Sequence, residues 1–338
     1  MSLAIEIAER RLAPDFVLRA TMRRMMQRRL RAEASSDRND WIAALGAGPI
    51  AEQTDAANEQ HYEVPAEFFR LCLGPHLKYS CGFWPDAATT LADSEAAMLA
   101  LSAERAALAD GQQVLELGCG WGSLSLWMAE HYPASTITSV SNSASQRAFI
   151  EQRARDRGLR NLEVITADMR DFAIDRQFDR VVSIEMFEHM RNYRLLLERV
   201  ASWLRADGRA FVHIFCHREY SYPFENENGN DWMTQHFFSG GIMPNYDIFA
   251  HFTDHLTVEQ QWQVNGKHYE RTSNAWLAEL DRNRAAATQA LAAAVPGHEI
   301  QRMLQRWRMF YMACAELFGT NGGKDWFVGH YRLKKTPA

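Results

Sequence analysis

Short apolar runs alternate with longer amphipathic segments between about residues 106 and 215. The runs are bounded by turn residues, which is typical of buried strands, and the segments between them repeat their apolar positions at helical spacing. This alternation predicts a doubly wound, Rossmann-like α/β fold, with a parallel sheet covered by helices on both faces. The expected strands are Val114–Leu117, Thr136–Val140, Leu162–Thr166, Phe178–Ile184 and Arg209–Phe215. The expected helices are Ser123–His131, Ser145–Arg157 and Tyr193–Leu204.

A helical region precedes this core. Residues 1 to about 34 have helical spacing, residues 35–40 form a polar break, and residues 91–108 form an Ala-rich helical pattern. We therefore expect residues 1–105 to form an N-terminal helical region that covers part of the active site. The main domain is expected over residues 106–338.

The alternation stops after Phe215. Residues 216–255 are rich in aromatic side chains and carry Gly240, Gly241 and Pro244. A segment of this length without secondary structure is usually a functional loop, so we predict an inserted lid there. The pattern then resumes with a strand over Leu256–Val264, helices near Asn274–Asp281 and Glu299–Leu317, and a final strand over Trp326–Lys334.

The most informative motif lies at the end of the first expected strand. Glu116 is followed by three glycines at alternate positions, Gly118, Gly120 and Gly122, and then by a helix. Glycines let the backbone approach a ligand closely, and an acid at a strand end can hold ribose hydroxyls. The spacing differs from the Gly-x-Gly-x-x-Gly loop of dinucleotide enzymes. It favours S-adenosylmethionine, which has a ribose but no phosphate, over a glycine turn that only closes a βα unit.

Composition and charge exclude several classes of partner. Lys and Arg number 37 and Asp and Glu 42, and the resulting net charge of −5 argues against nucleic-acid binding. The five cysteines form no Cys-x-x-Cys pair, and no His or Cys cluster has metal-ligand spacing. We therefore expect no metal site and a cytoplasmic protein. The chain shows neither the apolar core of a signal peptide nor a run of about 18 apolar residues, so we expect no transmembrane segment.

One segment departs from the even charge distribution. Between Phe16 and Arg31 lie six arginines and no acid, while Leu18, Met22 and Met26 recur at helical spacing. A basic amphipathic helix can touch anionic lipid or an acidic partner, which would give peripheral membrane contact. The alternative, which we favour, is a helix packed on its own protein with a solvated arginine face. Whether the protein forms a homodimer stays open.

Further polar residues follow the expected strands. In open α/β sheets, ligands bind beyond the carboxyl ends of the strands. We expect Asp168 to bind the adenine amino group, with a helix cap as the alternative. The residues at these ends are Glu116 after the first strand, Ser141, Asn142 and Gln146 after the second, Asp168 and Met169 after the third, and Glu185 after the fourth.

The sharpest cluster is Glu185, Glu188 and His189. If the chain turns helical there, these residues lie at i, i+3 and i+4 on one face, so two carboxylates and an imidazole meet at the rim of the cofactor crevice. Such crowding favours shifted pKa values and acid–base chemistry. Methyl transfer from a sulfonium needs an amine without its proton, and positive charge then develops on the nitrogen. A nearby carboxylate stabilises that charge, and His or Glu can accept the proton.

Several strings beyond the glycine motif resemble one family. They are His61-Tyr62-Glu63-Val64-Pro65, Leu77-Lys78-Tyr79-Ser80-Cys81, Ser183 to Met190, Phe237 to Pro244 and Ala315 to Gly319. They are similar to the cyclopropane-fatty-acyl-phospholipid synthase superfamily, and within it most similar to the coclaurine N-methyltransferase branch. The resemblance runs from about residue 60 to the C-terminus.

The resemblance implies a seven-stranded methyltransferase core that binds S-adenosylmethionine and releases S-adenosylhomocysteine. It assigns amine binding and proton removal to Glu185, Glu188 and His189. It further implies that the following residues touch the cofactor: Tyr79, Ser80, Gly118, Ser141, Asn142, Gln146 and Met169.

The lipid branch of this family implies an alternative. Its members bind bicarbonate as the base, and Cys81, Glu188, His213 and Tyr269 resemble the residues that hold it. Lipid synthases typically carry glycine at the position of Glu185. A carboxylate beside a hydrocarbon chain costs several kcal/mol of desolvation, whereas beside an amine it is compensated. We therefore expect N-methylation of a small, partly aromatic amine. Methylation or cyclopropanation of unsaturated acyl chains is the alternative, and a cofactor-binding scaffold without turnover is a third.

Overall fold

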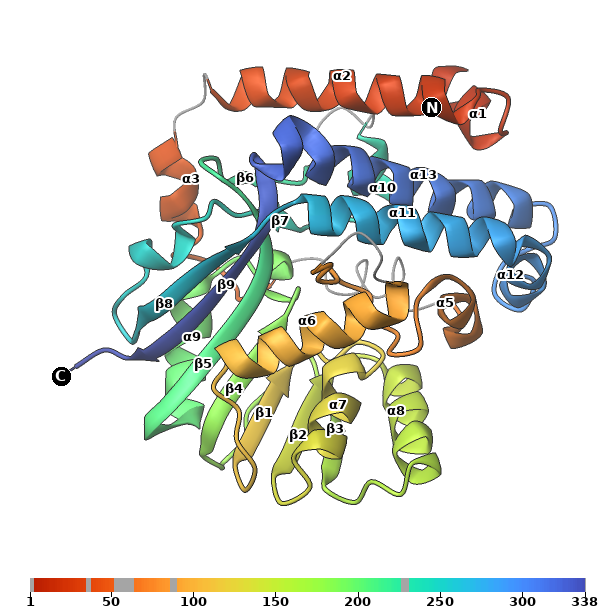
Figure 1. Cartoon of the computed structure of the whole chain (residues 1–338). Helices are drawn as coiled ribbons and strands as arrows, with labels where there is room; N and C mark the ends of the chain where they lie inside the picture. Colours follow the sequence, from red (N-terminus) through yellow and green to blue (C-terminus); the bar gives the residue numbers. More distant parts are fainter. Residues whose placement is uncertain (1–2, 35–37, 52–63, 86–89, 226–230, 338) are drawn as a thin grey trace.

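The computed structural model describes residues 3–34, 38–51, 64–85, 90–225 and 231–337. The expectations on Ser35–Ser36, on the string His61-Tyr62-Glu63 and on part of the predicted lid lie outside these residues. The described part contains a seven-stranded sheet with the strand order β3-β2-β1-β4-β5-β9-β8 (Figure 1). The strands are β1 (Gln113–Leu117), β2 (Thr136–Ser141), β3 (Leu162–Thr166), β4 (Phe178–Ile184), β5 (Leu204–His217), β8 (Leu256–Val264) and β9 (Trp326–Lys335).

The sheet is mixed, with five parallel strands. β1 to β5 run parallel, whereas β9 is antiparallel to both β5 and β8. Successive side chains of a strand point to opposite faces of the sheet. Val114 on β1 packs with Leu124 of α7 on one face, and Leu115 packs with Leu196 of α9 on the other. The connecting helices are α6 (Leu91–Arg105), α7 (Ser123–His131), α8 (Ala144–Asp156) and α9 (Tyr193–Trp203). The doubly wound α/β prediction is therefore confirmed.

The order of the strands reverses at β1, which lies between β2 and β4. The connections that leave the carboxyl ends of β1 and β4 run toward opposite halves of the sheet, and a crevice opens between them beyond the strand ends. The glycine loop after β1 and the turn after β4 are therefore neighbours, although 67 residues separate Gly118 from Glu185. This topology positions the candidate site.

Most expected boundaries agree with the structure, but two elements begin earlier than expected. β5 starts at Leu204, which pairs with Phe178, instead of at Arg209. Helix α11 (Lys267–Arg282) starts seven residues before the expected Asn274. Its buried face includes Thr272 and Ser273, so the inward stripe of α11 looks polar in the sequence and hides the first turns.

The prediction that residues 216–255 lack secondary structure is wrong. The segment contains a two-stranded sheet of β6 (Tyr222–Pro223) and β7 (Ile242–Met243), the helix α10 (Trp232–His236) and the 3₁₀ turn η2 (Ile248–His251). These elements are very short, and apolar periodicity needs a longer window to indicate a helix or a strand.

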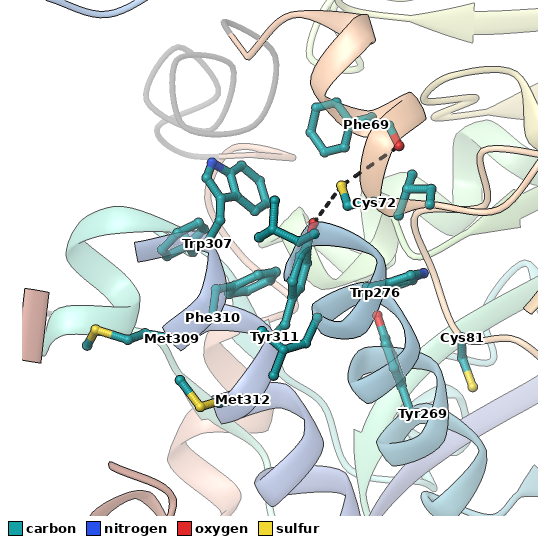
Figure 2. Close-up of a cluster of buried hydrophobic side chains, with 14 of the residues drawn as sticks. Phe69, Cys72, Cys81, Tyr269, Trp276, Trp307, Met309, Phe310, Tyr311 and Met312 are labelled. Carbon is teal, nitrogen blue, oxygen red and sulfur yellow. Dashed lines mark hydrogen bonds between the residues drawn. The ribbon is translucent and has the colours of Figure 1, made fainter. Parts of the chain in front are cut away.

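A helical layer lies over the strand ends (Figure 1). Its centre is an aromatic core between α5, α11 and α13, in which Phe69, Trp276, Trp307 and Tyr311 are buried. Figure 2 shows Cys72 of α5 inside this core, with its Sγ 3.2 Å from the Tyr311 hydroxyl oxygen. The helices are α1 (Leu3–Glu9), α2 (Asp15–Glu33), α3 (Arg38–Ala44), α5 (Ala66–Cys72), α11, α12 (Arg284–Leu291) and α13 (Ile300–Gly319), which the 3₁₀ turn η3 (Thr320–Gly323) follows.

The arginine-rich segment forms α2, which packs along α13. Leu18 is buried, and Arg19 and Arg23 pair with Glu316 of α13 at 2.8 and 2.6 Å. Packing on its own protein is thus confirmed for this helix. In the described residues no helix is long and apolar enough to cross a membrane. The exposed large apolar side chains of the described residues nevertheless all belong to this end of the chain: Leu3, Ile7, Leu12, Phe16, Val17 and Met25.

Candidate functional site

A cavity of about 1030 Å³ lies beyond the carboxyl ends of β1 and β4. α1 and α2 line it on one side, and α13 and the 216–255 segment line it on others. Its wall is mainly aromatic and aliphatic, as is usual for small-molecule sites. The predicted site residues that line the cavity are Tyr79, Ser80, Glu116, Gly118, Gly120, Gln146, Glu185, His189 and Tyr269. Those outside the lining are Cys81, Gly122, Ser141, Asn142, Asp168, Met169, Glu188 and His213.

The glycines after β1 have different tasks. All three adopt positive φ angles, which side chains disfavour. A Cβ on Gly118 would lie 2.6 Å from Met186, and one on Gly122 would lie 2.6 Å from Ile150. A Cβ on Gly120 would meet no protein atom within 4 Å. Gly118 and Gly122 therefore allow close packing of the protein, whereas Gly120 keeps the cavity wall open to a ligand.

This difference predicts two distinct phenotypes. Gly122→Ala should destabilise the fold by about 1–3 kcal/mol, because overpacking against a buried Ile150 adds to the strain at φ 79°. Gly120→Ala should fold with a smaller loss but bind S-adenosylmethionine at least about tenfold more weakly, since its methyl group narrows the cavity. Thermal unfolding and calorimetric titration measure the two effects separately. Wild-type affinity in Gly120→Ala would show that this backbone does not touch the cofactor.

Glu116 is buried beneath the glycine loop. Its Oε2 accepts hydrogen bonds from the hydroxyls of Ser125 and of Ser139, the latter at 2.9 Å. Burial raises the pKa of Glu116 to about 7, although both serine hydroxyls lower it. The carboxylate is thus positioned at the cavity wall by α7 and β2, and its contact with a ribose stays a prediction.

Gln146 supplies the clearest sign that a polar ligand fits here. Its Oε1 accepts a 2.7 Å hydrogen bond from Ser141, which fixes the orientation of the amide. Its Nε2 is buried and has no hydrogen-bond partner in the described part of the chain. A buried donor without an acceptor is costly, so this amide suits a ligand oxygen or nitrogen. The residues present therefore fit S-adenosylmethionine.

Asp168 accepts hydrogen bonds from the backbone and the guanidinium of Arg170, so it shapes the turn after β3. Its contact with adenine stays a prediction.

Lys78 lines the cavity, is buried and donates a hydrogen bond to Ser80, but no role was predicted for it from the sequence. Its position inside the Leu-Lys-Tyr-Ser-Cys string was the available signal.

The chain does not turn into an α-helix at Glu185, so the condition for a shared helical face is not met. Glu185 ends β4 with φ at 48°, in the left-handed region, and only Phe187–His189 form a 3₁₀ turn (η1). The three side chains therefore do not share one helical face. Glu185 and His189 line the cavity, whereas Glu188 is fully buried outside the lining, with its Oε1 accepting a 2.8 Å hydrogen bond from the N–H of Phe215. Left-handed backbone at a non-glycine residue is strained, and such strain is concentrated at functional sites.

Three donors surround the Glu185 carboxylate, and the sequence analysis had named all three residues. Oε1 lies 3.1 Å from the backbone nitrogen of Cys81 and 3.2 Å from Nε2 of His213. Oε2 accepts a 2.7 Å hydrogen bond from the hydroxyl of Tyr269. We call these three groups the donor cup. Three of the four residues that resemble a bicarbonate site, Cys81, His213 and Tyr269, thus hold the carboxylate of Glu185, whereas Glu188 does not.

The two glutamates of this site have different environments. Burial raises the pKa of Glu185, and Lys78 and the hydroxyl of Tyr269 oppose this increase. Burial and the charge of Glu185 raise the pKa of Glu188 well above its ordinary value. Two like charges cannot both be stable so close together in an apolar site. Ionisation is therefore less costly at Glu185 than at Glu188.

His189 completes this side of the cavity. Its ring stacks on Phe238 of the 216–255 segment, with 4.8 Å between the ring centroids. Within the described ranges, no group of three or more His, Cys, Asp or Glu side chains is arranged to hold a metal ion. Glu185 and His189 both line the cavity, where a carboxylate can bind a cation and an imidazole can accept a proton.

Comparisons with known proteins show the family to which the chain belongs. The family model "Mycolic acid cyclopropane synthetase" matches residues 51–324. The (S)-coclaurine N-methyltransferase of Thalictrum flavum is 37% identical over 336 residues, covering 96% of this chain and 93% of that protein. The cyclopropane-fatty-acyl-phospholipid synthase of Escherichia coli K12 is 29% identical over 80% of this chain and 66% of that protein.

Solved structures point the same way. A coclaurine N-methyltransferase bound to N-methylheliamine and SAH superposes with a TM-score of 0.93 at 35% identity, covering 98% of this chain and 99% of that one. A mycolic acid cyclopropane synthase in complex with SAH and CTAB shares the fold, with a TM-score of 0.70 at 24% identity over 84% of this chain and 99% of that one. The chain therefore belongs to the mycolic acid cyclopropane synthetase family and is an S-adenosylmethionine-dependent methyltransferase.

Proposed function

We propose that this enzyme N-methylates an apolar, partly aromatic amine. The observation that carries the proposal is the Glu185 carboxyl group, held by the donor cup at the wall of a mainly apolar cavity. A buried carboxylate there is compensated by a cationic substrate and not by a hydrocarbon. The N-methyltransferases among its relatives, which include coclaurine and pavine N-methyltransferases of Thalictrum flavum, support the same acceptor atom.

The cavity wall supports the aromatic part of the proposal. Rings of Phe215, Phe238 and Phe318 form a connected group, with Phe215 5.4 Å from Phe238 and 6.2 Å from Phe318 between centroids. Tyr269 stacks on Phe318 at 4.2 Å, so the ring that bonds to Glu185 also belongs to this wall. An amine attached to an aromatic skeleton places its charge at Glu185 and its rings against these side chains.

Each residue then has a defined part in the reaction. When bound, S-adenosylmethionine supplies an electrophilic methyl group on its sulfonium. Glu185 pairs with the ammonium form of the substrate and stabilises the positive charge that grows on nitrogen during attack. His189 accepts the proton that leaves the ammonium before attack. Glu188 holds the N–H of Phe215 behind the wall and keeps η1 in place.

The test is a methyl-transfer assay with purified enzyme. Secondary amines of graded size, from dimethylamine to coclaurine, are incubated with S-adenosylmethionine in bicarbonate-free buffer, and products are identified by mass spectrometry. We expect methylation to increase with the aromatic surface of the amine. Absence of any methylated amine, together with saturable cofactor binding in calorimetry, would reject nitrogen as the acceptor.

A second candidate is modification of unsaturated acyl chains. Its support is the exposed apolar side chains on α1 and α2 beside the exposed Arg24, Arg28 and Arg31, which suit contact with an anionic lipid surface. The occupied donor cup counts against it, because bicarbonate would need the donors that Glu185 already engages. Fatty-acid profiles of cells with and without the gene decide: a profile that changes supports the acyl substrate, and an unchanged profile rejects it.

A further inference from the structure

A chain of hydrogen bonds leads from Glu185 away from the cavity and across the sheet. His213 on β5 lies directly opposite His330 on β9 in the antiparallel register. Nε2 of His213 is 3.2 Å from Oε1 of Glu185, and Nδ1 of His213 is 2.9 Å from Nε2 of His330. Nδ1 of His330 is 2.9 Å from Nη1 of Arg105, the last residue of α6. Both histidines are fully buried, and the proposed mechanism uses neither His330 nor Arg105.

The chemistry of arginine fixes the direction of this chain. A guanidinium has five N–H groups and no acceptor, so Arg105 must donate to Nδ1 of His330. His330 then carries its proton on Nε2 and donates it to Nδ1 of His213. His213 in turn carries its proton on Nε2 and donates it to Glu185. Arg105, which can only donate hydrogen bonds, thus selects the tautomers of two neutral histidines. The chain of hydrogen bonds ends at the carboxylate of Glu185.

We propose that Arg105 is a positioning residue which, through His330 and His213, keeps Glu185 ionised and oriented toward the cavity. The inference rests on the proposed function, since it concerns the same carboxylate. A hydrogen bond from a neutral N–H to a carboxylate favours the charged form. The chain is also no exit for the substrate proton, because Arg105 cannot accept one. That proton must leave through the cavity, on the side of His189.

The surroundings agree with neutral histidines. Burial, followed by the charges of Lys78 and Arg105, lowers the pKa of His213 well below its ordinary value. Burial, His213, Arg105 and Lys78 do the same for His330. The ionisable groups of the described residues that face Glu185 or this chain are Lys78 and Cys81 before α6, Glu104 and Arg105 on α6, Glu188 on η1, His213 on β5, Tyr246 in the 216–255 segment, Tyr269 on α11, Cys314 on α13 and His330 on β9.

The first test reads the tautomers directly and needs no substrate. Ring ¹⁵N resonances of labelled enzyme are assigned with His213→Gln and His330→Gln, and wild-type His213 and His330 are expected as neutral Nε2–H tautomers from pH 6 to 8. In Arg105→Met, His330 loses its donor, and its Nδ1–H form is expected to become populated. A charged ring or an Nδ1–H tautomer in the wild type would overturn the proposal, whatever the substrate of the enzyme is.

The second test is the pH profile of kcat/KM. Activity needs ionised Glu185, so its acid limb falls as pH falls through the pKa of that carboxyl. Arg105→Met should move the acid limb to higher pH by about 1 unit, which is about a tenfold loss of kcat/KM at a pH on that limb. The limb moves because the hydrogen bond from His213 to the charged Glu185 carboxylate is weakened. Arg105→Lys keeps a donor without an acceptor and should restore most of the shift.

Arg332→Met is the matched control. Both Arg105 and Arg332 lie over the ring of Trp262, at 5.1 and 5.7 Å from its centroid. Nη1 of Arg332 donates a 3.3 Å hydrogen bond to the main-chain oxygen of Arg105, which Arg105→Met retains, and its other side-chain hydrogen bonds among the described residues go to Glu259 and Gln260 and not to the histidines. Its profile should stay at the wild-type position. An Arg105→Met profile that matches wild type would refute the positioning role. A changed profile with an unchanged acid limb would assign Arg105 to structure alone and refute it equally.

Discussion

Glu185→Gly is expected to abolish methyl transfer in bicarbonate-free buffer and to regain part of it when bicarbonate is added. Removal of the side chain empties the donor cup, whose three donors then suit a small planar oxyanion. Glycine adopts a φ angle of 48° without steric strain, so the substitution should not harm the fold. The wild type should show no dependence on bicarbonate. Initial rates at 0 and at millimolar bicarbonate, at constant pH and ionic strength, measure the effect.

The matched variant is Glu185→Gln, which fills the cup but carries no charge. It should lower kcat by about 10²–10³-fold without rescue by bicarbonate and with nearly unchanged affinity for S-adenosylmethionine. Wild-type rates in Glu185→Gln would remove the carboxylate from the mechanism. A wild type that needs bicarbonate would instead show that Glu185 does not replace it.

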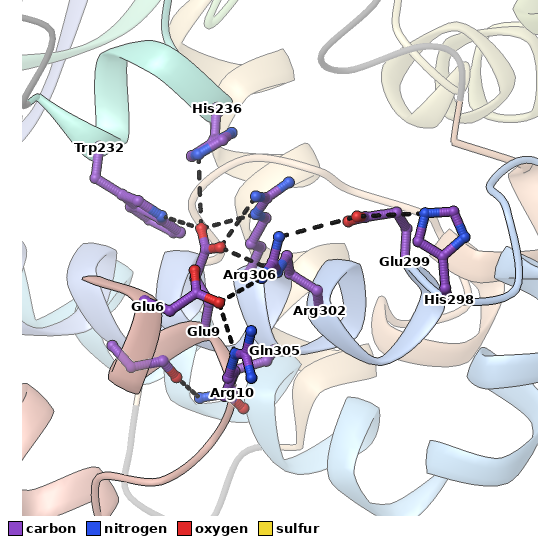
Figure 3. Close-up of polar contacts among 11 residues, drawn as sticks. Glu6, Glu9, Arg10, Trp232, His236, His298, Glu299, Arg302, Gln305 and Arg306 are labelled. Carbon is purple, nitrogen blue, oxygen red and sulfur yellow. Dashed lines mark hydrogen bonds and ion pairs between the residues drawn. The ribbon is translucent and has the colours of Figure 1, made fainter. Parts of the chain in front are cut away.

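Glu9→Gln is expected to release α1 from the cavity. Figure 3 shows Glu9 at the centre of a network that joins α1 to α10 and α13. Its carboxylate accepts hydrogen bonds from Nε and Nη2 of Arg306 at 2.8 and 3.0 Å and from Nε1 of Trp232 at 2.8 Å. Loss of one partner of a buried ion pair costs about 3–5 kcal/mol, since the other charge stays desolvated. Hydrogen exchange in Leu3–Glu9 should accelerate by at least about 100-fold.

Glu6→Gln is the control for this prediction, because Glu6 lies on the same helix and pairs with the more exposed Arg10 and Arg302. Pairs of that kind contribute little, so exchange in α1 should change by less than about tenfold. The KM for the amine should rise in Glu9→Gln alone, since α1 lines the cavity. Equal exchange rates in the two variants would show that the Glu9 network does not anchor α1.

The same network has a defined pH dependence. Burial raises the pKa of Glu9, but the hydrogen bonds from Arg306 and Trp232 and the nearby charges outweigh burial, and the pKa lies below its ordinary value of 4.5. A lowered carboxyl pKa means that the stabilisation is complete above the pKa of the unfolded chain and is lost as pH falls through the folded value. The anchor of α1 is therefore intact at neutral pH and weakens only in acid.

The parallel core could be predicted from the sequence because its signals are local. Each of the strands β1 to β4 is a short segment with Val, Ile or Leu side chains between turn residues, and the glycine turn after β1 needs positive φ angles that few residues other than glycine adopt. The short elements of residues 216–255 could not be predicted, since two-residue strands contain no periodicity. α5 and α12 were missed for a related reason: each is no longer than eight residues.

Only part of the site could be predicted from the sequence. The order of strands placed Glu116, Glu185 and Gln146 at one edge, which local motifs and the switch-point rule are sufficient to predict. The left-handed turn at Glu185 was missed because a run of good helix formers follows it. Distant partners were missed because no local pattern indicates them. Glu9 and Arg306 are separated by 297 residues, and only the β5–β9 register brings His330 to His213.

The left-handed backbone of Glu185 has an evolutionary consequence. Glutamate codons GAA and GAG differ from glycine codons GGA and GGG by one nucleotide, and the main chain at this position already has the shape that glycine prefers. An enzyme that holds its own carboxylate in the donor cup and one that takes an oxyanion from solution are therefore one nucleotide apart, and the same main chain suits both.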